Sequence, residues 1–101
     1  MGGLRGVSVE ENPETEIGYA LMQEFWGRGL ATELAQMSAR VGFAMFDFPN
    51  LVSFTSPTNR ASRRVMEKVG FSFERDFTYK GLAQVLYRLT QTAWHELQIR
   101  S

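Results

Sequence analysis

The stretch FWGRGLATE (residues 25–33) places two glycines and an alanine directly before a run of good helix formers. Glycine has no Cβ, so Gly27 and Gly29 allow a sharp turn and the close approach of a ligand to the backbone. The first N–H groups of a helix have no partner within the helix and lie at the positive end of its dipole. The stretch therefore predicts a loop and helix start that form an anion site, although glycine-rich helix starts are also common in proteins that bind nothing.

The composition indicates one small globular domain over residues 1–101. The chain has 101 residues, of which 44% are hydrophobic, and its formal charges cancel. A neutral chain attracts the phosphate backbone of nucleic acids only weakly, so we expect no nucleic-acid partner. No apolar run reaches membrane-spanning length, and the first residues lack the pattern of a secretory signal. We therefore expect a cytoplasmic protein with no membrane partner.

Two residue types that often build catalytic and metal sites are nearly absent. The chain has no cysteine and a single histidine, His95. A thiolate nucleophile and a thiolate metal site are thereby excluded, and a histidine-based metal site or catalytic triad is not expected. We expect no bound metal.

Alternation of apolar and polar residues predicts strands on both sides of the glycine-rich stretch. Ahead of it, LRGVSV (4–9) indicates a short strand, EENPE (10–14) a charged turn, and EIGYALM (16–22) a strand. Gly18 within the last of these marks a bulge or a close backbone approach. Three more strands are predicted after it: LVSFTS (51–56), FSFERDF (71–77) and LAQVLYRL (82–89).

Helical spacing of apolar residues predicts two main helices. The first follows the glycine loop and ends before DFPN (47–50), and its predicted buried face consists of Leu30, Leu34, Met37, Val41 and Met45. The second, RASRRVMEKV (60–69), follows a loop at residues 57–59. Gly70 stands where a helix C-cap is expected.

The order of these elements, β-β-α-β-α-β-β, predicts an α/β (α+β) fold with a mixed sheet. Such alternation requires at least one crossover between parallel strands. Both helices start after consecutive strands, so their N-termini are expected at the same edge of the sheet. Ligands bind at this edge in open sheets.

Three segments in this order resemble one family. EIGYAL (16–21), FWGRGLATE (25–33) and NRASRRVMEKVGF (59–71) are similar to the second half of the GNAT family of N-acetyltransferases, most closely to the branch of ribosomal-protein N-terminal acetyltransferases. The resemblance covers roughly residues 16–89. Most of the family's usual N-terminal part, which builds the acceptor side, has no counterpart in this sequence.

The resemblance implies acetyl-CoA as the cofactor and assigns residues to it. In the family, the strand matching residues 16–22 pairs with the pantetheine arm, and the loop after it holds the pyrophosphate through backbone N–H groups. Trp26 replaces the first polar residue of the loop pattern. The implied cofactor-binding residues are Tyr19, Ala20, Leu21, Arg28, Gly29, Leu30, Ala31, Thr32, Asn59 and Ser62.

The resemblance also implies direct acetyl transfer to an amine, for which two side chains are catalytic candidates. Glu16 is the candidate general base, with an exposed strand-edge glutamate as the alternative. Ser62 is the candidate hydrogen-bond donor to the thiolate, because the second helix contains no tyrosine. Asn59 is either a helix cap alone or also a contact to pantetheine. The arginines at 60, 63 and 64 are solvated or contact the 3′-phosphate, and at least two are expected to be solvated.

Two functions follow from the resemblance. The first is an acetyl-CoA-dependent N-acetyltransferase acting on the primary amine of a protein N-terminus or a small molecule. The alternative is a truncated, non-catalytic CoA-binding module that self-associates. Without the usual N-terminal part, the sheet is expected to show an unpaired edge and an uncovered apolar face, so we expect a homo-oligomer, in the simplest case a dimer.

Overall fold

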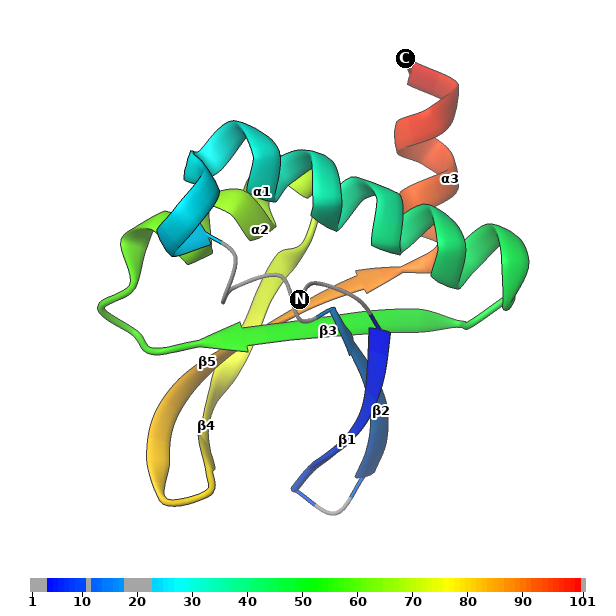
Figure 1. Ribbon diagram of the computed structural model, residues 1–101. Coiled ribbons are helices and arrows are strands. Elements are labelled where there is room, and N and C mark those ends of the chain that lie inside the picture. The colour runs from blue at the N-terminus through cyan, green and yellow to red at the C-terminus, as the bar shows by residue number, and fades with distance from the viewer. Residues whose placement is uncertain (1–3, 11, 18–22, 101) are drawn as a thin grey trace.

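The computed structural model describes residues 4–10, 12–17 and 23–100. Five strands form one sheet, and the long helices lie on one side of it (Figure 1). The elements in chain order are β1 (Leu4–Val9), β2 (Asn12–Ile17), α1 (Gln23–Arg40), the π-helical segment η2 (Val41–Met45), β3 (Asn50–Thr55), α2 (Arg60–Val69), β4 (Ser72–Tyr79), β5 (Leu82–Thr90) and α3 (Gln91–Arg100). The predicted α/β class and its mixed sheet are confirmed.

The sheet has the strand order β1-β2-β3-β5-β4. Strands β1 and β2 form an antiparallel hairpin, β4 and β5 form a second one, and β3 pairs antiparallel with β5. Strands β2 and β3 run parallel and are connected through α1. This is the crossover that the alternation of elements predicted.

The main core lies between the helices and the upper face of the sheet. Strand β5 contributes alternate residues to it, Val85, Tyr87 and Leu89, as expected for a strand with one face on this core. Helix α1 contributes Ala35 and Ala39, which are completely buried. Their small side chains let the backbone of α1 pack closely against its neighbours.

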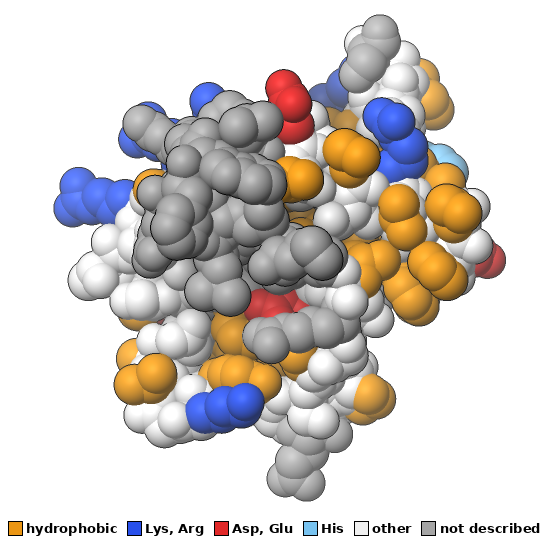
Figure 2. All heavy atoms as spheres, viewed as in Figure 1, with side chains coloured by type: hydrophobic (Ala, Val, Ile, Leu, Met, Phe, Trp, Pro, Cys, Tyr) orange, Lys and Arg blue, Asp and Glu red, His pale blue; other side chains and the backbone are white. Residues whose placement is uncertain are grey.

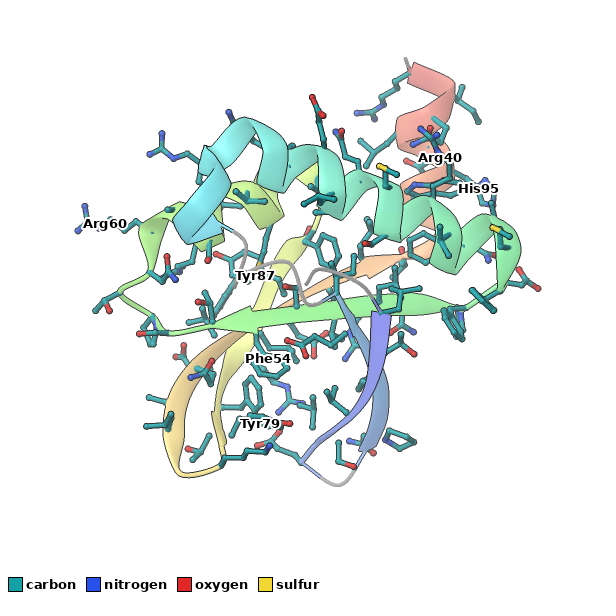
Figure 3. The ribbon with its side chains drawn as sticks, viewed as in Figure 1. Arg40, Phe54, Arg60, Tyr79, Tyr87 and His95 are labelled. Carbon is teal, nitrogen blue, oxygen red and sulfur yellow. The ribbon has the colours of Figure 1, made fainter. Side chains whose placement is uncertain are left out.

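The lower face of the sheet forms a second, smaller core. The two hairpins extend below β3 on either side of a space into which Phe54 and Tyr79 project (Figures 1 and 3). This cluster consists of Val9, Val52, Phe54, Phe77 and Leu86, with Val7 and Tyr79 packed against it. The expectation of an uncovered apolar face is therefore wrong for this part of the sheet, because the hairpins bury its side chains between them.

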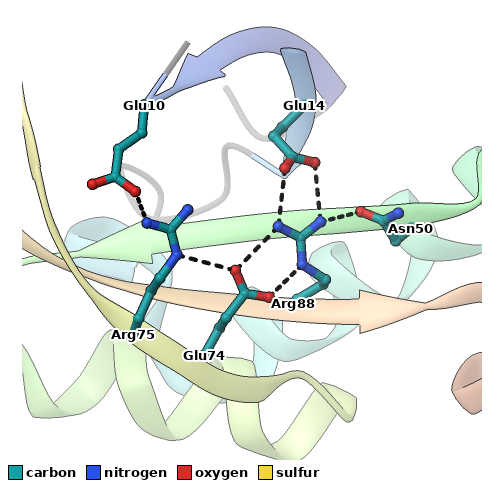
Figure 4. A network of polar contacts seen from close by, with 6 residues as sticks. All are labelled: Glu10, Glu14, Asn50, Glu74, Arg75 and Arg88. Carbon is teal, nitrogen blue, oxygen red and sulfur yellow. Dashed lines mark hydrogen bonds and ion pairs between the residues drawn. The ribbon is translucent and has the colours of Figure 1, made fainter. Parts of the chain in front are cut away.

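A polar network joins the two hairpins across the lower face (Figure 4). Arg88 of β5 donates to both carboxylate oxygens of Glu14 on β2, at 3.0 and 2.9 Å, and to Glu74 on β4 at 2.5 and 3.2 Å. It also donates to Asn50 of β3, and Arg75 forms an ion pair with Glu10 beside the β1–β2 turn. Hydrogen bonds to the two carboxylates raise the pKa of Arg88, so its positive charge is retained.

The helix ends confirm two predictions from the sequence. Asn59 caps α2, and Gly70 follows it with a left-handed backbone, φ 116°, as a C-cap glycine should. The Gly70 N–H donates to the carbonyls of Met66 and Glu67 at 3.2 and 3.1 Å, which satisfies the last turn of the helix.

The predicted buried face of the first main helix is wrong at Met37 and Met45, which have exposed fractions of 59% and 74%. Leu34 and Val41 are half-buried. Among the side chains described in α1 and η2, the buried ones include Ala35, Ala39 and Phe43. Small residues pack against the sheet and α2, while the larger apolar residues lie along the rim of the helix. The spacing of apolar residues correctly predicted a helix here. The assumption that its larger apolar side chains face the core was wrong.

Three predicted boundaries also differ from the structure. Strand β2 starts at Asn12, so most of the predicted charged turn is paired with β1 in the hairpin. Helix α1 starts at Gln23, so Gly27 and Gly29 lie within it rather than in a loop before it. A third helix, α3, follows β5 and was not predicted; its Trp94 is buried beside Phe43, with ring centroids 5.3 Å apart.

Candidate acyl-transfer site

The two long helices start at the same end of the molecule, beyond the carboxyl end of β3 (Figure 1). Strands β2 and β3 are in register at Glu16 and Val52, one pair in the described residues. Near it, the Ser53 hydroxyl donates to the carbonyl of Ile17 at 3.5 Å. Both long helices therefore start at the edge of the sheet where the sequence predicts a ligand site.

Glu16 is buried in the interior of the sheet. Its exposed fraction is 5%, and β2 lies between β1 and β3, so the alternative of an exposed strand-edge glutamate is wrong. The next residue, Ile17, belongs to the core under the helices. Because successive side chains of a strand point to opposite faces, Glu16 faces the lower side of the sheet.

The start of α2 holds two more of the predicted site residues, Asn59 and Ser62. The Asn59 side-chain oxygen accepts a hydrogen bond from the Ser62 N–H at 3.1 Å, so its helix-cap role is confirmed. Ser62 is completely buried on the helix side of the sheet. Glu16 and Ser62 therefore approach the parallel strands from opposite sides, and the structure does not bring them together on one face.

Arg63 fixes the loop before α2 to the last strand. Its Nη1 donates to the carbonyl of Pro57 at 2.8 Å, and its Nε donates to the Tyr87 hydroxyl at 3.1 Å. That hydroxyl donates in turn to Glu67 at 3.1 Å. The hydrogen bond with Tyr87 raises the pKa of Arg63, and Figure 3 shows Tyr87 beneath the helices. Sequence reasoning missed this positioning role, because Arg63 and Tyr87 are 24 residues apart.

The remaining arginines of α2 are exposed, as expected for two of the three. Arg60 projects away from the molecule at the end where α2 starts (Figure 3), and Arg64 follows one turn later. The first turn of α2 carries no acidic residue, although the helix dipole favours negative charge there. Within the part of the chain that the structure describes, neither side chain has an ion-pair partner. Their position suits a bound anion.

The glycine-rich segment has a different conformation from the one predicted. Residues 28–32 lie in the second and third turns of α1, where N–H groups have partners within the helix. A backbone cradle made by these residues therefore requires α1 to begin later than it does here. Thr32 is half-buried, and Tyr19, Ala20 and Leu21 lie outside the described residues.

The described residues contain neither a metal-binding cluster nor a membrane-spanning helix. In residues 4–10, 12–17 and 23–100, no group of three or more His, Cys, Asp or Glu side chains is placed to hold a metal ion. None of the described helices is long and apolar enough to span a membrane.

Comparison with known proteins identifies the family. The family model described as an acetyltransferase (GNAT) domain matches residues 1–72. The chain belongs to the GNAT acetyltransferase family. GNAT enzymes use acetyl-CoA, and the fold, the two helix N-termini and the parallel strand pair agree with that assignment.

Two curated relatives and one solved structure illustrate the similarity to other GNAT proteins. The chain is 30% identical to the FsC-acetyl coenzyme A-N(2)-transacetylase of Aspergillus fumigatus, over 94% of this chain and 46% of that protein. It is 33% identical to the uncharacterized protein YkkB of Bacillus subtilis, over 72% of this chain and 42% of that protein. The crystal structure of the ribosomal-protein-S5-alanine acetyltransferase from Vibrio fischeri matches with a TM-score of 0.70 and 19% identity, over 93% of this chain and 56% of that one.

These matches differ in what they say about the chain. At 19% identity the Vibrio fischeri structure shows a shared fold only. The chain spans less than half the length of both curated relatives. The family and the fold are therefore established, and the acceptor is not.

Proposed function

We propose that residues 1–101 form a single acyl-CoA-binding domain that transfers an acetyl group from acetyl-CoA to a primary amine in the cytoplasm. The observation that carries the proposal is that both long helices start beyond the ends of the parallel strands β2 and β3 in a GNAT chain. Arg60 and Arg64 at the start of α2 are exposed and form no ion pair with another described residue, which supports an anionic cofactor there.

The proposed cofactor contacts come from three segments of the chain. Residues 19–21 would pair with the pantetheine arm, the first turns of α1 would hold the pyrophosphate, and the cap of α2 would lie beside the thioester. The proposed contact residues are Tyr19, Ala20, Leu21, Arg28, Gly29, Leu30, Ala31, Thr32, Asn59 and Ser62. For the N–H groups of residues 28–32 to be free, the first turns of α1 must open when the cofactor binds.

Acetyl-CoA supplies a thioester whose carbonyl carbon forms a C–N bond with the amine as the C–S bond breaks. Glu16 accepts the proton that the amine nitrogen loses, directly or through water. Ser62 donates a hydrogen bond to the departing sulfur. Since Glu16 and Ser62 face opposite sides of the sheet, the amine and the cofactor enter from opposite sides. That arrangement suits direct transfer without an acetylated protein intermediate.

We propose a protein N-terminus as the acceptor, as in the branch of ribosomal-protein N-terminal acetyltransferases. The motif FWGRGLATE, through its resemblance to that branch, supports this acceptor. A small-molecule amine is the other acceptor class, supported by the similarity to the Aspergillus fumigatus transacetylase. A panel of both amine types distinguishes them.

A second candidate function is a CoA-binding module without turnover. It is favoured by the sequence of α2, RASRRVMEKV, which contains no tyrosine to act on the departing sulfur. Both functions require cofactor binding, and the acetyltransferase alone requires release of CoA in the presence of an amine.

Calorimetric titration with acetyl-CoA tests cofactor binding, which both candidate functions require. We expect saturable binding near one cofactor per chain, and loss of more than about tenfold in affinity for Gly29→Val, because a branched side chain blocks approach to the backbone. Gly6→Val is the matched control, since the space around a Cβ at Gly6 is open. Unchanged affinity of Gly29→Val would remove the pyrophosphate assignment.

A thiol-release assay with a panel of amines tests catalysis. The chain has no cysteine, so released CoA is measured without background from the protein. We expect Glu16→Gln to lower kcat by about 100-fold and to leave acetyl-CoA affinity nearly unchanged. Ser62→Ala should lower kcat less than Glu16→Gln does, but more than it lowers acetyl-CoA affinity, because Ser62 is also a proposed cofactor contact. Equal kcat for a variant and its parent would exclude that residue from the mechanism.

We also propose a homodimer that forms through the apolar rim of α1. A pocket of about 490 Å³ opens there, lined by Leu4, Leu34, Met37, Ser38, Val41, Phe46 and Phe48. Met37 and Phe46 are 59% and 60% exposed, and Figure 2 shows hydrophobic side chains gathered on this side. Strand β1 forms the nearby edge of the sheet, so a second copy would cover both the pocket and the edge.

Sedimentation velocity tests the dimer. We expect a dimer for the parent and a monomer for Phe46→Ser, since this substitution removes a large apolar contact from the rim. Leu82→Ser is the matched control, because Leu82 is 65% exposed in the distant β4–β5 hairpin. A monodisperse parent monomer at high concentration would contradict the proposal.

A further inference from the structure

A second pocket lies between the helices, at the opposite end of the helical layer from the starts of α1 and α2. It has a volume of about 300 Å³, at the lower end of the range for small-molecule sites. Figure 3 shows Arg40 beside α3, on the opposite side of the molecule from Arg60 and the start of α2. The pocket is lined by Gln36, Ala39 and Arg40 of α1, Lys68 and Val69 of α2, and Trp94, Leu97 and Gln98 of α3.

The floor of this pocket is apolar. Ala39, Val69 and Trp94 have exposed fractions of 0%, 6% and 9%, so they form a rigid floor with a small exposed area, and the half-buried Leu97 adds to it. The indole of Trp94 packs against Phe43, which holds its orientation. The apolar part of a ligand at this floor must therefore be small, such as a single flat ring.

The rim of the pocket is polar and positively charged. Arg40 and Lys68 come from different helices, and Gln36 and Gln98 add amide donors on the same rim. None of the lining residues is acidic. Arg40 and Lys68 also form no ion pair with any residue in the part of the chain described.

A position near a helix C-terminus explains each cation separately. Both lie in the last turn of their helices, where the dipole favours positive charge. It does not explain why both border one pocket with an apolar floor and no carboxylate. A ligand that carries a negative group would neutralise both cations at once.

We propose that this pocket binds a small organic carboxylate with an apolar body. The carboxylate would accept hydrogen bonds from Arg40 and Lys68 at the rim, while the body would lie on Trp94. The site is separate from the acyl-transfer site, and its occupancy does not depend on acetyl-CoA.

Benzoate is the probe, and benzamide is its neutral counterpart of nearly the same shape. We expect saturable shifts of a tryptophan side-chain N–H resonance with benzoate, with a dissociation constant in roughly the millimolar range, and at least about tenfold weaker binding of benzamide. The substitution Trp26→Phe assigns the resonance to Trp94, because the chain has two tryptophans. This comparison uses the otherwise unaltered protein, so it does not depend on how other variants fold.

The double variant Arg40→Gln/Lys68→Gln should bind benzoate at least about tenfold more weakly, and it should remain folded with a melting temperature lower by only a few degrees, because each cation favours the end of its helix. Arg64→Gln is the matched control, since Arg64 is an exposed cation of α2 outside the pocket. Equal binding of benzoate and benzamide, no saturable shift, or full affinity in the double variant would overturn the proposal. Displacement of benzoate by saturating acetyl-CoA would also overturn it, because the anion would then occupy the cofactor site.

Discussion

Arg88→Ala should lower the free energy of unfolding by about 2–4 kcal/mol, because it removes charge-assisted hydrogen bonds and leaves two carboxylates without their partner. The side chains of Arg88 and Glu14 are 21% and 15% exposed, so solvent replaces little of what is lost. Their bidentate contact joins β5 to β2, and the contacts to Glu74 join the same guanidinium to β4. One substitution therefore removes the polar link between the two hairpins.

Thermal unfolding followed by circular dichroism measures this effect. A loss of this size corresponds to roughly 10–20 °C in Tm for a domain of about 100 residues. Arg88→Lys should recover part of the loss, since lysine keeps the charge but not the planar fork. Arg75→Ala is the matched control, because the side chains of Arg75 and Glu10 are 36% and 50% exposed, and we expect less than about 1 kcal/mol. Equal effects of Arg88→Ala and Arg75→Ala would show that the contacts of Arg88 contribute no more to the free energy of unfolding than the exposed contacts of Arg75 do.

Gly70→Ala should lower the free energy of unfolding by about 2–4 kcal/mol. Two contributions are expected, backbone strain and a contact with Leu97, and suitable variants can separate them. The residue has φ 116°, which side chains with a Cβ rarely adopt. A Cβ at this position would also lie 2.4 Å from the Cδ1 of Leu97 on α3. The substitution therefore strains the end of α2 and forces the Leu97 side chain to move.

Gly81→Ala is the matched control for the backbone term. Gly81 has φ 81° in the β4–β5 turn and open space around a Cβ, so its substitution reports strain without a clash. The double variant Gly70→Ala/Leu97→Ala removes the contact but keeps the strain. If chemical denaturation gives equal losses for Gly70→Ala and Gly81→Ala, the contact with Leu97 has no energetic role.

Local sequence signals predicted the elements better than their packing. Asn59 and Gly70 identify both ends of α2, because a cap and a left-handed glycine act on neighbouring backbone groups. The alternation in residues 82–89 likewise identifies the face of β5 that meets the helices. Such signals act within a few residues, so a single sequence contains them.

Prediction failed where distant segments decide the outcome. Pro13 and Glu14 resemble a turn in sequence, but pairing with β1 and the contact to Arg88 hold them in a strand. The buried face of α1 depends on how closely the helix approaches α2, and the sequence alone favoured its larger side chains.

The candidate site also combines features set by neighbouring residues, which were predictable, with features set by distant segments, which were not. The cap at Asn59 was predictable, whereas the burial of Glu16 follows from the position of β2 between two other strands. The contacts of Arg63 with Pro57 and Tyr87 required the fold itself. The basic pocket between the three helices was not predictable, because α3 was missed.

The bridge between the hairpins also bears on the order of folding. Glu14 and Arg88 are 74 residues apart, whereas the strands within each hairpin are close neighbours in sequence. Closing a loop of that length costs about 4 kcal/mol of chain entropy, so each hairpin should form before the two are joined. On the ribosome Glu14 of the first hairpin must wait for β5 to emerge, and until β4 and β5 are made the lower core lacks Phe77 and Leu86.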